Sequence, residues 1–154
     1  MTSLSYEDIF SDFLGNISDY KIASLEISEA YELMREYLHK SLSQSYVRRL
    51  FSSVSVDDEI QFVSFEMEHS VDEEADIDFV RNILSKCMVI EWLNPQVRSR
   101  LLTAQMFGGK EQSWFSQASH LTQLRGLLDD VKLEVRKAIR DRGYIYNDYL
   151  GGNK

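Results

Sequence analysis

The residues best suited to chemistry are ten carboxylates between Asp57 and Asp78, a segment that contains no lysine or arginine. Hard divalent cations prefer oxygen ligands, so a calcium or magnesium site is one interpretation. However, the run from Asp72 to Asp78 lacks the sharp-turn glycine and the late bidentate glutamate of an EF-hand loop. We therefore expect no metal and no cofactor, and we interpret this acidic segment as a solvated loop followed by a helix start.

Histidine, cysteine and serine offer no better site. His39, His69 and His120 fall in different predicted elements, without the spacing of metal ligands. Cys87 lies in an apolar stretch, where a small core residue is the better interpretation than a nucleophile. Neither a nucleophile-elbow pattern nor a phosphate-binding loop occurs. We therefore predict that the chain is not an enzyme.

The elements that would carry these side chains are mostly helical. Apolar residues recur at steps of three and four, which predicts helices at 6–17, 29–43, 73–93, 97–107 and 116–142. Pro95 is the only proline, and its ring and missing N–H should end the central helix near Asn94. The apolar stripes predict a core that includes Phe10, Leu84, Met88, Trp92, Leu124 and Val131.

One segment has a strand pattern instead. Between Ile60 and Glu68, apolar and polar side chains alternate, and such a strand needs either a hairpin with 46–54 or the edge of another chain. We predict a mainly α fold, a bundle of about four to five helices with a long C-terminal helix and a short strand or hairpin near 46–68. One helical domain would span 1–143, and an extended aromatic tail would span 144–154.

Composition restricts the class of protein further. No apolar run approaches the roughly 18 residues that cross a bilayer, so we expect that the protein neither spans nor binds a membrane. The first residues have neither the basic nor the apolar region of a secretory signal. A single cysteine cannot form an internal disulfide. These features predict synthesis in a reducing cytoplasm.

Charge is distributed unevenly along the chain. Residues 1–94 hold 19 acidic and 7 basic side chains, whereas residues 95–154 hold 6 acidic and 10 basic ones. The two parts either face each other within one subunit, or meet between neighbouring copies of a ring. For the ring, we expect the acidic segment to contact Arg98, Arg100, Arg136 or Arg140 of the next copy. The net charge of −8 disfavours nucleic-acid binding.

Aromatic residues indicate a second contact surface. Tyr144, Tyr146 and Tyr149 follow the predicted end of the last helix, and Leu150 comes next. Tyrosine is enriched at interfaces because it combines contact area with a polar end. Trp114, beside a diglycine, must likewise either pack under the bundle or meet a partner. We predict that Trp114 and the tail contact another chain, although packing on their own domain is the alternative.

Two stretches resemble a known group: Met88-Val-Ile-Glu-Trp-Leu-Asn-Pro-Gln-Val97 and Phe115-Ser-Gln-Ala-Ser-His-Leu-Thr-Gln-Leu-Arg-Gly-Leu-Leu-Asp129. Together with residues 6–20, they are similar to small proteins encoded among the structural genes of tailed bacteriophages of Gram-positive bacteria. The resemblance implies a virion protein of the neck, an adaptor-like head–tail connector. Such adaptors form rings, typically of twelve copies, between the portal protein and a neighbouring neck or tail protein. The strand-like segment departs from a plain helical adaptor.

Two alternatives stay open. Another virion role, in tail completion or in a baseplate, fits the same composition. An acidic regulatory protein that blocks a basic host protein would use the negative charge of residues 1–94. The basic last helix argues against this second alternative, because a nucleic-acid mimic benefits from uniform negative charge.

Overall fold

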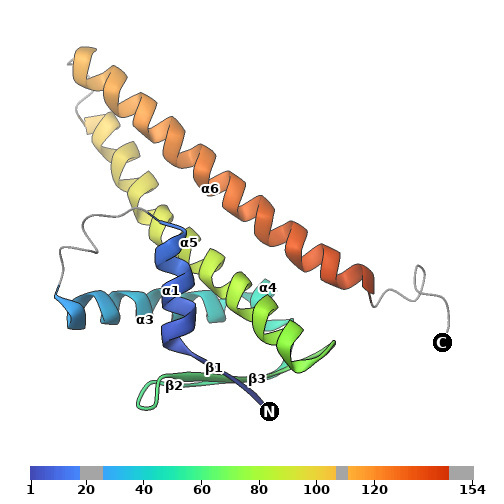
Figure 1. The fold of residues 1–154 in the computed structure, drawn as a ribbon. Helices are drawn as coiled ribbons and strands as arrows, with labels where there is room; N and C mark the ends of the chain where they lie inside the picture. Colours follow the sequence, from blue (N-terminus) through green and yellow to red (C-terminus); the bar gives the residue numbers. More distant parts are fainter. Residues whose placement is uncertain (18–25, 107–110, 146–154) are drawn as a thin grey trace.

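The computed structural model describes the backbone of residues 1–17, 26–106 and 111–145, and the side chains of residues 1–17, 26–98 and 121–142. Helices account for most of the described chain, and three short strands lie in its first half (Figure 1). The order is β1 (Thr2–Ser5), α1 (Tyr6–Gly15), α3 (Ile27–Ser43), α4 (Ser45–Arg48), β2 (Phe51–Asp57), β3 (Phe62–Met67), α5 (Glu73–Met106) and α6 (Glu111–Ile145).

The fold class predicted from the sequence, a helical bundle, is wrong. Three strands form an antiparallel sheet in the order β1-β3-β2, so the protein is mainly helical with a small sheet. The β1 strand escaped prediction because its four residues have no strand pattern of their own. It is stabilised by pairing with a strand 60 residues away, in the register Leu4 opposite Val63.

The sheet has one apolar and one polar face. Leu4, Val63 and Val56 lie side by side across the three strands, and all three belong to the hydrophobic core or pack against it. The next row consists of Ser3, Ser64 and Ser55, of which Ser3 and Ser55 are exposed. Successive side chains of a strand point to opposite faces, so this alternation turns one face of the sheet toward the helices.

A single core joins the sheet to α1, α3, α5 and α6. The core residues predicted from helical spacing are buried, each with at most 9% of its surface exposed. Burying an aliphatic or aromatic side chain contributes about 1.5–3 kcal/mol, so these positions account for much of the stability. They are Phe10, Leu84, Met88, Trp92, Leu124 and Val131.

Two helix starts were predicted correctly and one was not. The Ser5 hydroxyl accepts a hydrogen bond from the amide of Asp8 at 3.2 Å, as the N-cap of α1. The Asp72 carboxylate caps α5 by accepting a hydrogen bond from the amide of Ala75 at 2.8 Å. By contrast, α3 begins at Ile27 after the N-cap Glu26, two residues before the predicted start at residue 29.

The α5 helix continues through Pro95, so the predicted end near Asn94 is wrong, and residues 97–106 belong to the same helix. Proline inside a helix costs about 3 kcal/mol because it removes one backbone hydrogen bond. The side-chain amide of Gln96 adds a bond to the carbonyl of Trp92 at 3.2 Å. The buried residues before the proline hold α5 in place despite that cost.

The α6 helix is also longer than predicted. It begins at Glu111 and continues past Gly143 to Ile145. The predicted boundary between a domain at 1–143 and a tail at 144–154 therefore lies inside a helix. Local sequence suggested a stop because glycine is a weak helix former, but its cost is only about 1 kcal/mol.

Together, α5 and α6 form a long antiparallel hairpin (Figure 1). The first half of α5 lies beside the sheet, α1 and α3, and α6 packs along α5 with its end near the loop between β3 and α5. The other half of the hairpin projects well beyond these elements. The molecule therefore consists of a compact base, which holds the sheet, and a projecting helical arm.

Candidate functional site

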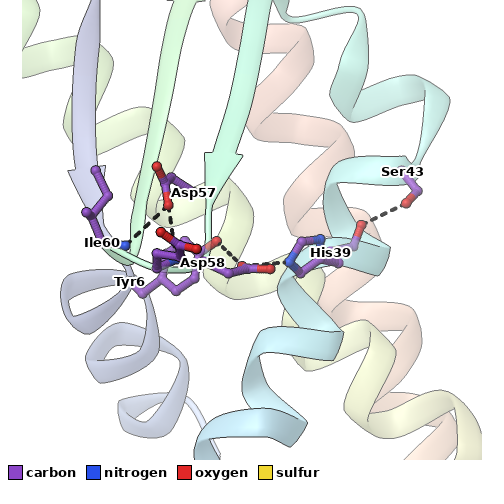
Figure 2. Close-up of polar contacts among 7 residues, drawn as sticks. Tyr6, His39, Ser43, Asp57, Asp58 and Ile60 are labelled. Carbon is purple, nitrogen blue, oxygen red and sulfur yellow. Dashed lines mark hydrogen bonds and ion pairs between the residues drawn. The ribbon is translucent and has the colours of Figure 1, made fainter.

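The first candidate surface is a polar junction between α1, α3 and the turn that joins β2 to β3 (Figure 2). The carboxylate of Asp58 accepts a hydrogen bond from the hydroxyl of Tyr6 at 2.6 Å. The same oxygen lies 3.0 Å from Nε2 of His39. The bond from Tyr6, followed by that from His39, lowers the pKa of Asp58. Burial, with the bond to Asp58 as a second cause, raises the pKa of Tyr6.

A tight turn places Asp58 at this junction. The carboxylate of Asp57 accepts from the amides of Glu59 and Ile60 at 3.0 and 3.2 Å, which closes the turn. Gln61 then adopts a positive φ of 62°, a backbone conformation that residues other than glycine rarely adopt. Its carbonyl accepts from the amide of Tyr6 at 2.9 Å. The strained residue thus joins the turn to the start of α1.

The second candidate surface lies where the end of α6 meets the start of α5. Arg142, near the end of α6, donates to the Asp76 carboxylate at 2.7 Å and to the carbonyl of His69 at 2.8 Å. Asp76 also accepts from the Ser70 hydroxyl at 2.5 Å. The Arg142 guanidinium lies 4.4 Å from the ring centroid of Phe79. Only 11% of the Arg142 side chain and 5% of the Asp76 side chain are exposed.

Burial and hydrogen bonding act in opposite directions on the Asp76 carboxyl. Burial favours its neutral form, but the hydrogen bonds from Ser70, Arg142 and the amide of Val71 outweigh burial. The pKa of Asp76 is therefore lowered. A carboxylate satisfied in this way stays ionised in an interior position. The end of α6 is consequently joined to the start of α5 by a buried ion pair.

Ser43 and His39 do not form a catalytic relay of the serine–histidine type. Ser43 donates to the backbone carbonyl of His39 at 2.7 Å, and not to its ring (Figure 2). Burial raises the pKa of the Cys87 thiol to about 12, so it is a thiol at neutral pH. No group of three or more His, Cys, Asp and Glu side chains within the described part of the chain could hold a metal ion.

The predicted interface residues belong to α5, to α6 and to the segment that follows α6 in the sequence. Arg98, Arg136 and Arg140 are exposed. Arg100 lies on α5, and Trp114 and Tyr144 lie on α6, at positions whose side chains are outside the described set. Tyr146, Tyr149 and Leu150 are outside the described residues altogether, as is the side chain of His120.

The two charged parts of the chain meet within one subunit at Asp76 and Arg142. Lys86 of α5 and Glu134 of α6 form a second, more exposed pair at 3.1 Å. Other carboxylates of the acidic segment remain exposed beside these pairs. They include Glu66, Glu68, Asp72, Glu73 and Glu74. The acidic base thus keeps surface charge for a partner after its internal pairing.

Sequence reasoning missed the junction of Tyr6, His39 and Asp58. The signal for its turn was present, since two aspartates between alternating apolar residues are typical of a hairpin. No signal linked that turn to His39, because the contact depends on how α3 packs.

No helix in the described part of the chain is both long enough and apolar enough to cross a membrane. Comparisons of the chain with protein-family models, with curated proteins and with solved structures each find no match.

Proposed function

We propose that this protein is a structural subunit of a tailed-phage virion, a head–tail connector that assembles as a ring between the portal protein and a tail component. The observation that carries the proposal is the α5–α6 hairpin, half of which projects from a compact base (Figure 1). The α6 helix also exposes the basic side chains of Arg136 and Arg140. The resemblance of residues 88–97 and 115–129 to phage structural proteins supports the same assignment.

The α6 helix is suited to side-by-side packing of copies. Leu127 and Leu133 on α6 are 44% and 48% exposed, which leaves apolar surface on a helix that also carries Arg136 and Arg140. In a ring, each copy uses two different surfaces, one for the preceding copy and one for the following copy. The basic side chains near the end of α6 and the acidic side chains at the start of α5 provide two different surfaces that meet this requirement.

We propose that Glu73 and Glu74 at the start of α5 face Arg136 and Arg140 of the next copy. All four are exposed in the single subunit, and Asp76 of the same segment is already paired internally. Each exposed ion pair contributes only about 0–1 kcal/mol. We propose that these ion pairs orient neighbouring copies. The exposed apolar surface of α6 would supply the larger part of the binding energy.

The test is particle assembly from a phage genome in which Arg136 and Arg140 are both replaced by glutamate. We expect separate heads and tails in electron micrographs, because repulsion would prevent the ring from closing. Combining this change with Glu73→Arg and Glu74→Arg should restore joined particles. Lys40→Glu on α3 reverses another exposed charge and serves as the control, which should assemble normally.

Normal particles from the Arg136→Glu, Arg140→Glu genome would remove the proposed contact. Joined particles from a genome that lacks the whole gene would overturn the connector role itself.

A further inference from the structure

A pocket of 310 Å³ lies between the helical part of the base and the edge of the sheet. Its helical wall consists of His39, Leu42 and Ser43 from α3 and Arg48 from α4. Three consecutive residues of β2, Val54 to Val56, form the opposite wall. The volume is at the lower end of the ~300–1,000 Å³ that is typical of ligand sites.

The pocket lies along the edge of β2. Neighbouring side chains of a strand point to opposite faces, so a pocket on one face would contact only every second residue. Here Val54, Ser55 and Val56 all line the pocket, although Ser55 belongs to the polar face and the two valines pack against the core. Only the strand edge adjoins all three.

That edge has free hydrogen-bonding capacity. Among the described strands, β2 pairs only with β3, in a regular register from Ser53 to Asp57. Alternate residues of an edge strand point their N–H and C=O groups away from the sheet. An extended peptide can satisfy these groups as an additional strand, a recognised mode of peptide binding.

The walls of the pocket indicate which peptide would fit. Leu42, Val54 and Val56 offer apolar contact to alternate side chains of an added strand. Arg48 is exposed, and its guanidinium has no ion-pair partner among the described residues. Arg49 next to it is also exposed. The unpaired cation at the mouth of the pocket is complementary to a carboxylate.

We propose that β2 binds an extended acidic segment of a partner chain as a fourth strand, with a carboxylate of that segment on Arg48. This inference goes beyond the connector role and does not depend on it. The partner segment would alternate apolar and acidic residues, so that its apolar side chains enter the pocket while its carboxylates stay at the mouth.

The test uses the full chain and a blocked hexapeptide of threonine, valine, glutamate, valine, glutamate and threonine. Titration should shift the amide resonances of Val54, Ser55 and Val56 and slow the hydrogen exchange of those whose N–H points away from β3. A peptide with lysine in place of glutamate should bind at least about ten-fold more weakly, because it places like charge on Arg48. Arg48→Gln should weaken binding of the acidic peptide similarly, while Arg49→Gln should have a smaller effect.

Two further peptides separate strand addition from simple anion binding. One is N-methylated at its odd residues and the other at its even residues. The peptide whose methyl groups replace the N–H groups that point toward β2 should lose binding, and the peptide methylated on the opposite edge should keep it. Acetate at the same carboxylate concentration should leave the exchange of the β2 amides unchanged. Equal binding of both methylated peptides, protection by acetate alone, or an absence of shifts in β2 would overturn the proposal.

Discussion

The guanidinium of Arg142 lies 2.7 Å from the carboxylate of Asp76, although 66 residues separate the two along the chain. This pair joins the end of α6 to the start of α5, and both side chains are almost completely buried. The pair thereby holds the two helices of the hairpin together at the end opposite the projecting arm.

Removing one member of this pair should be costly. Arg142→Ala leaves the Asp76 carboxylate buried without its cation, which typically costs about 3–5 kcal/mol. We expect the free energy of unfolding, measured by urea denaturation, to fall by about that amount. Arg140→Ala, at a side chain that is 59% exposed, is the matched control and should change it by less than about 0.5 kcal/mol. Equal effects of the two substitutions would show that the buried pair is not a stabilising contact.

The same pair predicts an acid-sensitive stability. The pKa of Asp76 is lowered in the folded protein, so its contribution is fully present above the unfolded value of about 3.9. The contribution is lost as pH falls through the lower, folded pKa. Asp76→Asn should therefore be less stable than the unmodified protein at neutral pH, and the difference should narrow below about pH 4. Asp58, whose pKa is also lowered, contributes in the same direction.

Thermal unfolding as a function of pH measures this difference. Asp78→Asn, at a carboxylate that is 60% exposed, should follow the pH profile of the unmodified protein. A constant gap between Asp76→Asn and the unmodified protein from neutral to acid pH would contradict the role assigned to the carboxylate.

Pro95 offers a test of how α5 is stabilised. Its side chain is exposed, and the helix continues on both sides of it. Replacing it with alanine restores one backbone donor, so we expect the free energy of unfolding to rise by about 1–3 kcal/mol. Asn94→Ala controls for helix propensity alone and should add at most about 0.7 kcal/mol. A loss of stability in Pro95→Ala would show that the proline makes a contact that the helix requires.

Gln61 tests whether strain is stored at the junction turn. A left-handed conformation costs any residue other than glycine roughly 1–2 kcal/mol. Glycine avoids that cost, but its greater conformational freedom in the unfolded chain offsets part of the gain. Gln61→Gly should therefore stabilise the protein by a net ~0.5–1 kcal/mol, measured by chemical denaturation. Gln61→Ala keeps the strain and should leave stability nearly unchanged. A less stable glycine variant would show that the glutamine side chain is needed.

Local signals in the sequence were sufficient for several features of the fold. The cap at Ser5 depends on a hydroxyl and an amide three residues apart, and the cap at Asp72 uses the same spacing. The burial of Leu124 and Val131 follows from helical periodicity. Each of these features depends on neighbours within two turns of a helix, so the sequence alone carried the information.

Features that depend on distant contacts were not predictable in this way. The β1 strand is stable only against β3, and α5 passes Pro95 because packing outweighs a local penalty. The pair of Arg142 with Asp76 and the contact of His39 with Asp58 both join elements far apart in the chain. Charge counts suggested that acidic and basic parts would meet, but not which residues would do so.

The most direct test of the connector role is a cryo-electron microscopy map of phage particles that carry this protein. We predict a ring of this chain between portal and tail, in which Arg136 and Arg140 of each copy face Glu73 and Glu74 of the next. A map in which the protein is absent from the neck, or in which these charged residues contact no neighbouring copy, would contradict the account.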